Sequence, residues 1–247
     1  MSGVAAIGDK VAHYELGARI ARPFDGTTEA FRATDHGGLE VMLEVLRPDA
    51  TSVEKARFGT RARRLQGVRV SSLYTLIELG PKFAAFELPV GEPLESHAGV
   101  AALRARQKVA WIARTAAALA GIHKVGIVHG HFELGNVLIL SDQSVKVSVP
   151  LGGDVSGTPL EDVRALAIAA VALLLGHDPR NELESGIVER LLQAGINQDV
   201  SMVLARLRGG TSMTSHEIAD RLAPFVDPSL GPMTEPSFPA SSLSPRR

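Results

Sequence analysis

The sequence predicts an α+β protein with two lobes: a five-stranded antiparallel sheet with one helix, then a mainly helical part. In the first 90 residues, short apolar runs alternate with turns that contain Gly or Pro, which is typical of strands. Further along, apolar residues recur at three- and four-residue spacing, as on one face of a helix. A chain of 247 residues is long enough for two small lobes around a shared cleft.

The first lobe is expected to span residues 12–90, after an N-terminal tail of residues 1–11. Its helix is predicted at residues 52–66 and carries a basic face that includes Arg57 and Arg64. Its five strands are predicted at residues 14–21, 29–34, 41–46, 73–79 and 83–88, with turns at residues 22–28 and 35–38.

The second lobe is expected to span residues 91–226. Thr214 and Glu217 have the spacing of a capping box, which predicts the start of the last helix. Gly176 is expected to end the helix predicted at residues 162–175. The other elements are predicted as helices at residues 103–124, 162–175, 186–194 and 199–207 and as strands at residues 137–140 and 145–149.

Composition excludes several function classes. The formal net charge of -1 gives no electrostatic reason to expect nucleic acid or an anionic membrane as partner. The absence of cysteine excludes disulfides and thiolate metal sites and is compatible with a cytoplasmic protein. No apolar run approaches the roughly 20 residues that span a bilayer, and no signal peptide is evident. Residues 227–247 are rich in Pro and Ser and are expected to be disordered.

The segment IVHGHFELGNVLI, residues 127–139, follows an expected long helix and enters a strand. It resembles the catalytic loop of the protein-kinase superfamily, which reads HRDxKxxN in protein kinases and HGDxxxxN in aminoglycoside and choline kinases. His129 matches the histidine and Asn136 the asparagine. His131 stands where the family has its catalytic aspartate.

Other segments resemble the family in the same order along the chain. Residues 14–17 resemble the start of a bacterial Ser/Thr kinase domain, and residues 41–48 resemble its third strand. Residues 86–91 resemble the hinge between lobes, and residues 162–167 the anchoring helix of the second lobe. The resemblance covers about residues 12–226 and implies a bilobal protein-kinase-like fold.

Within that resemblance, the nucleotide site departs from the family. Ala21 and Pro23 replace glycines of the phosphate-binding loop, and proline also removes an amide donor. Glu44 replaces the lysine that meets the phosphates, so it is expected to repel a nucleotide. Met42 replaces a small residue beside the adenine. The resemblance thus implies an occluded nucleotide pocket lined by Ala21, Pro23, Met42, Phe86, Glu87, Leu88 and Leu138.

The positions that align with the family's catalytic and metal-binding residues also differ from the family's pattern. Arg61 aligns with the glutamate that normally pairs with the family's lysine, which suggests a reversed Glu44–Arg61 ion pair; a merely solvated arginine is the alternative. Val149, or Pro150 with a one-residue shift, stands at the metal-binding aspartate, and Asp154 lies too far along. Asn136 alone is a poor magnesium site, because this cation usually needs a carboxylate. Residues 152–161 are too few for the usual activation segment.

These departures predict a catalytically inactive pseudokinase, a regulatory or scaffolding module that binds protein partners. No cofactor is expected, nor ATP or Mg²⁺. The basic helix face and the Pro/Ser-rich tail are the candidate partner surfaces. The alternative is a divergent small-molecule phosphotransferase of the aminoglycoside or choline kinase type, which Gly130 favours. A zinc site at His129 and His131, with His123 one turn earlier, is a weaker hypothesis because a further ligand is not evident.

Overall fold

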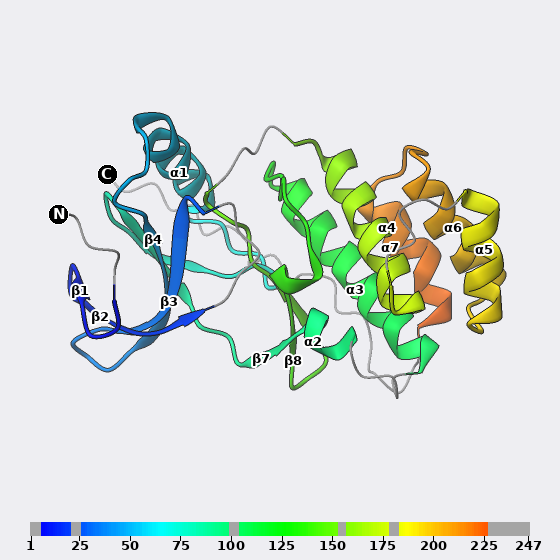
Figure 1. The fold of residues 1–247 in the computed structure, drawn as a ribbon, viewed down its shortest axis with the longest axis horizontal. Helices are drawn as coiled ribbons and strands as arrows, with labels where there is room; N and C mark the ends of the chain where they lie inside the picture. The colour runs from blue at the N-terminus through cyan, green and yellow to red at the C-terminus, as the bar shows by residue number, and fades with distance from the viewer. Residues whose placement is uncertain (1–5, 21–25, 99–103, 153–156, 178–182, 227–247) are drawn as a thin grey trace, which may run out of the picture.

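The structure is a computed structural model that describes residues 6–20, 26–98, 104–152, 157–177 and 183–226. It is a mixed α+β arrangement in which an antiparallel sheet and one helix lie at one end and a group of helices at the other (Figure 1). The predicted α+β class is therefore confirmed. Ala21, Pro23, Asp154 and the Pro/Ser-rich tail fall outside the described residues.

In the described residues the main sheet has six strands, in the order β1-β2-β3-β4-β6-β5, with all neighbours antiparallel. The expectation of five strands was wrong because β1 has only two residues, too few to show an alternating pattern, and it lies in the expected N-terminal tail. The strands are β1 (Lys10–Val11), β2 (Tyr14–Ile20), β3 (Thr28–Thr34), β4 (Glu40–Leu46), β5 (Leu76–Leu79) and β6 (Phe83–Glu87).

Helix α1 (Ser52–Leu65) lies beside this sheet (Figure 1). Thr51 and Glu54 form a capping box, in which each side chain accepts from the other residue's backbone N–H. Phe58, Ala62 and Leu65 form the buried apolar side of the helix, and Arg61 is buried with them. The helix therefore lies almost where the sequence predicts it.

The helical end is built around α3 (Ala105–Lys124), which packs against α4 (Pro159–Leu175) and α7 (Ser215–Leu222). Helix α4 begins three residues earlier than predicted because Thr158 and Glu161 form a capping box and proline suits the first helical position. Gly176 ends α4 with φ 77°, as predicted. The remaining helices are α2 (Leu94–Ala98), α5 (Glu184–Gln193) and α6 (Gln198–Arg208).

A small sheet connects the two ends. It consists of β7 (Gly91–Pro93), β8 (Val137–Leu140) and β9 (Val145–Val147), paired antiparallel in that order. Strand β7 was not predicted. A Cβ at Gly91 would lie 2.4 Å from the carbonyl oxygen of Ile139, so the close pairing of β7 with β8 requires glycine there.

The apolar core continues from the main sheet into the helices. One cluster of buried side chains includes Met42 and Phe58 at the sheet end and Leu119 and Leu166 at the helical end. Burial in a shared core fixes the two ends relative to the loop between them. Within the described part of the chain, no helix is both long and apolar enough to cross a membrane.

Candidate functional site

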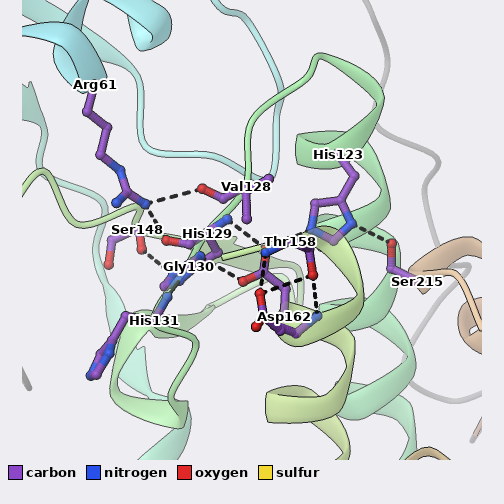
Figure 2. Close-up of polar contacts among 11 residues, drawn as sticks. Arg61, His123, Val128, His129, Gly130, His131, Ser148, Thr158, Asp162 and Ser215 are labelled. Carbon is purple, nitrogen blue, oxygen red and sulfur yellow. Dashed lines mark hydrogen bonds and ion pairs between the residues drawn. The ribbon is translucent and has the colours of Figure 1, made fainter. Parts of the chain in front are cut away.

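The loop between α3 and β8 contains the first ten residues of the 127–139 motif and contacts Arg61 of α1 and Asp162 of α4 (Figure 2). His129 is fully buried, and its Nε2 lies 2.9 Å from the carbonyl oxygen of Ser148. Its ring packs edge-on against Phe132, with 5.5 Å between ring centres. Burial lowers the pKa of His129 to about 4, although the nearby Asp162 carboxylate raises it. His129 is therefore neutral near pH 7 and donates through Nε2 to Ser148.

Asp162, in the first turn of α4, binds the backbone of this loop. One carboxylate oxygen accepts from the backbone N–H of His129 at 2.7 Å, and the other accepts from that of Gly130 at 2.7 Å. The side chain is 1% exposed. Its hydrogen bonds offset the cost of burying the side chain, so Asp162 can fix the loop to α4.

Asp162 also contacts His123 from α3, whose Nε2 lies 2.8 Å from the carboxylate. The other ring nitrogen of His123 lies 3.1 Å from the hydroxyl of Ser215, the first residue of α7 (Figure 2). Serine, histidine and carboxylate thus form a chain that looks like a hydrolase triad. Ser215 is 2% exposed, however, so a substrate could not reach its hydroxyl. The chain joins α3, α4 and α7 to the loop.

Gly130 has a structural reason to be glycine. Its φ is 76°, in the left-handed region that side chains rarely adopt. A Cβ at Gly157 would lie 3.1 Å from the Cα of Gly130, so the two backbones pass close together. A larger residue at position 130 would be strained at this crossing.

His131, which the sequence resemblance aligns with a catalytic aspartate, lies at the surface. Its side chain is 56% exposed, and its Nε2 lies 3.0 Å from the carboxylate of Glu133. Asn136 is buried and donates from Nδ2 to the carbonyl oxygen of His131 at 3.2 Å. No group of three or more His, Cys, Asp or Glu side chains that could hold a metal occurs among the described residues, so the zinc hypothesis gains no further ligand there.

Glu44, on β4, is fully buried and joins three segments of the chain. One oxygen of its carboxylate accepts from the hydroxyl of Thr28 on β3 at 2.9 Å and from the backbone N–H of Leu151 at 3.1 Å. Leu151 lies after β9 and is itself fully buried. The carboxylate thus ties the sheet to the segment that follows the small sheet.

Arg61 extends from α1 to the loop. It is 6% exposed, and its Nη2 donates to the carbonyl oxygens of Val128, at 3.2 Å, and His129 (Figure 2). These bonds fasten α1 to the loop from the side opposite Asp162. The contacts described for Arg61 and for Glu44 lead to different groups, and the reversed ion pair between them stays a prediction.

Of the side chains predicted to occlude a nucleotide pocket, Met42 lies on β4, Phe86 and Glu87 on β6 and Leu138 on β8, while Leu88 follows β6. Met42 pairs with Phe86 across β4 and β6, and both are buried in the same apolar core as Val149. Leu88 and Leu138 are half-buried.

Glu87, at the end of β6, forms an ion pair with Lys146 of β9 and accepts from the backbone N–H of Thr75 at 3.1 Å. The ion pair connects the main sheet to the small sheet. Sequence reasoning missed both this pair and the His123–Asp162 contact because each joins residues far apart in the chain.

Comparison with known proteins does not name a family. A scan against protein-family models finds no match to this sequence, and a search of curated proteins finds none either. What the chain does must therefore be inferred from the loop, its two anchors and the buried carboxylate on β4.

Proposed function

We propose that this chain is a pseudokinase: a bilobal protein-kinase-like fold that does not transfer phosphate and acts as a regulatory or scaffolding module by binding other proteins. The observation that carries the proposal is Glu44. Where the resemblance expects a lysine for the nucleotide phosphates, a fully buried carboxylate accepts from Thr28 and Leu151.

The order of elements supports the kinase-like part of the proposal. A sheet with a single helix precedes a long helix, and a two-stranded hairpin follows the motif loop. In the proposed fold, α4 corresponds to the anchoring helix, and Asp162 fixes the loop backbone from there. This support concerns the fold only, and a fold alone does not give a function.

Electrostatics argues against phosphate binding beside Glu44. Two unit charges of like sign about 4 Å apart repel by roughly 4 kcal/mol at an effective dielectric of about 20. The carboxylate already uses one oxygen for two donors, so bringing a phosphate close would add repulsion without a new bond. Met42 and Phe86 add apolar bulk that is packed into the core.

The proposal is tested by thermal shift of the full chain with ATP, with and without Mg²⁺. We expect no change in Tm for the wild type at millimolar nucleotide, because a ligand that does not bind the native state cannot stabilise it. A Mg²⁺-dependent rise of several degrees would contradict the proposal. Glu44→Gln is the matched variant: a shift that appears only in this variant would attribute the exclusion of nucleotide to the carboxylate.

The second candidate, a small-molecule phosphotransferase, is favoured by one observation. His131 is exposed and contacts Glu133, so an imidazole supported by a carboxylate stands at the place of the family's base. Incubation with ATP, Mg²⁺ and a panel of amino-alcohols and aminoglycosides, followed by mass spectrometry, tests it. A phosphorylated product that is lost in both His131→Ala and Asn136→Ala would support the enzyme and overturn the pseudokinase proposal.

A further inference from the structure

A pocket of about 660 Å³ lies between α1 and the start of the motif loop. One wall is a face of α1 and the other is formed by Ile127, Val128 and Gly157. Its α1 wall combines apolar side chains with hydroxyls and guanidinium groups. These residues are Ser52, Val53, Ala56, Arg57, Thr60, Arg61, Arg64 and Leu65.

The charged side chains that line the pocket are all positive. Arg57, Arg61 and Arg64 line it, and its described lining contains no Asp or Glu. Two carboxylates on adjoining elements are engaged in helix caps: that of Glu54 accepts from the backbone N–H of Thr51, and that of Glu161 accepts from the backbone N–H of Thr158. Neither of these side chains lines the pocket, so the charged groups of its described lining are the three arginines.

We propose that this pocket binds a phosphorylated serine or threonine in a segment of a partner protein. Arginine presents planar, bidentate donors that match a phosphate, and clusters of arginine are the usual means of recognising phosphorylated motifs. A phosphate is compact and carries close to two negative charges at pH 7, which suits several guanidinium groups around one cavity. This inference rests on the proposed function, because it names the partner chemistry of a module that acts by binding.

The rest of the lining favours a peptide over a free anion. Val53, Ala56 and Leu65 on α1 face Ile127 and Val128 across the cavity, so apolar surface lies beside the arginines. A phosphate ion has no group to cover that surface, whereas residues flanking a phosphoserine do. The cavity is also larger than one phosphate needs.

The C-terminal segment of this chain offers no charge complementarity to the pocket. Residues 227–247 contain two acidic residues, Asp227 and Glu235, and end in Arg246 and Arg247. Their formal charges cancel, so the arginines would gain nothing in net attraction. A segment from another protein, with its charge concentrated in one phosphate, is the better match.

Arg61 gives the pocket a physical connection to the motif loop. It lines the cavity, and its Nη2 donates to the carbonyl oxygens of Val128 and His129. A phosphate bound in the pocket would thus lie beside the side chain that fastens α1 to the loop. Binding is expected to stiffen this junction.

The test is binding of the full-length chain to two degenerate peptide libraries, one with a fixed central phosphoserine and one with serine. We expect selective capture of the phosphorylated library. The best captured peptide is then measured by fluorescence anisotropy against the wild type, Arg64→Gln and Arg63→Gln. Arg63 is adjacent, exposed and outside the pocket lining, so it is a matched control for charge.

We expect Arg64→Gln to weaken binding about tenfold, the loss of one charge-assisted contact, and Arg63→Gln to change it less than threefold. Equal weakening by both variants would mean that the helix attracts anions generally, and would overturn the assignment of the pocket as the binding site. Equal binding when phosphoserine is replaced by aspartate would overturn the assignment of the pocket to a phosphopeptide. Inorganic phosphate that binds as tightly as the phosphopeptide would overturn it too.

No capture of either library would overturn the inference as well. ATP turnover is measured on the same preparation. Turnover would remove the proposed function whatever the libraries show, whereas absent turnover with absent capture removes only the phosphopeptide site.

Discussion

Two buried carboxylates hold the centre of this molecule, and they differ in what they hold. Asp162 is 1% exposed and accepts from two consecutive backbone amides of the motif loop. Glu44 is fully buried and accepts from one hydroxyl on β3 and one backbone amide in the segment after β9. Asp162 begins the segment that resembles an anchoring helix, while Glu44 stands where the resemblance expects a lysine. One carboxylate therefore holds the backbone of the loop, and the other ties the main sheet to the segment after the small sheet.

The largest effect is expected at the loop anchor. Asp162→Ala removes the acceptor of the His129 and Gly130 amides and the partner of His123. Leaving buried donors without an acceptor should lower the free energy of unfolding by about 3–5 kcal/mol. Urea denaturation followed by circular dichroism measures it, and Asp162→Asn, which keeps one acceptor oxygen, should lose less. A loss below about 1 kcal/mol for the alanine variant would show that the loop is held by other contacts.

A smaller loss is expected at Glu44. Glu44→Ala leaves the Thr28 hydroxyl and the Leu151 amide without this acceptor, at about 1–3 kcal/mol for each group. We expect a total near 3 kcal/mol in the same denaturation experiment. Glu44→Gln keeps an amide oxygen in place and should lose less than half of that. If Glu44→Ala lowers the free energy of unfolding more than Asp162→Ala does, Asp162 is not the stronger of the two buried anchors.

The elements themselves could be predicted well from sequence. Helix α1 and strand β8 have local signals, a capping box in one and a compact apolar run in the other, and both lie within a residue or two of their predicted bounds. Strands β1 and β7 were missed because two or three residues cannot show periodicity. The start of α4 could have been predicted, because Thr158, Pro159 and Glu161 form a recognisable cap.

The site could be predicted only in part. The motif drew attention to His129 and Asn136, and both are buried in the loop. The contacts of Asp162 with His123 and of Arg61 with the loop carbonyls join residues 39 and more apart, and no local pattern records them. The position of Glu44 was identified, but its acceptance of the Leu151 amide depends on how the segment after β9 packs.

The stability of the loop should depend on pH through His129, whose backbone contacts both anchors of the loop, Asp162 and Arg61. His129 has a pKa near 4 in the folded state because of burial, with Asp162 favouring and Arg61 opposing its charged form. The unfolded chain takes up a proton near pH 6.5, so the free energy of unfolding should fall as pH drops from 7 to 5. For this one group the expected loss is about 2 kcal/mol, increasing toward pH 4.

The measurement is urea denaturation at pH 7, 6 and 5 for the wild type and His129→Gln, which cannot titrate there. Other histidines and carboxylates titrate alike in both proteins, so the difference in pH dependence isolates His129. Parallel pH profiles would mean that His129 is already charged or solvated in the folded protein. Its neutral contact with Ser148 would then have to be abandoned.

The smallest effects should come from the helix caps that position the two anchors of the loop. Thr51 caps α1, which carries Arg61, and Thr158 caps α4, which carries Asp162. Replacing either threonine by alanine should lower the free energy of unfolding by about 1 kcal/mol, because one backbone donor loses its acceptor. Hydrogen exchange distinguishes the two variants: only Thr158→Ala should speed exchange of the His129 and Gly130 amides, since α4 presents their acceptor. Equal acceleration in both variants would show that α1 and α4 hold the loop as one unit.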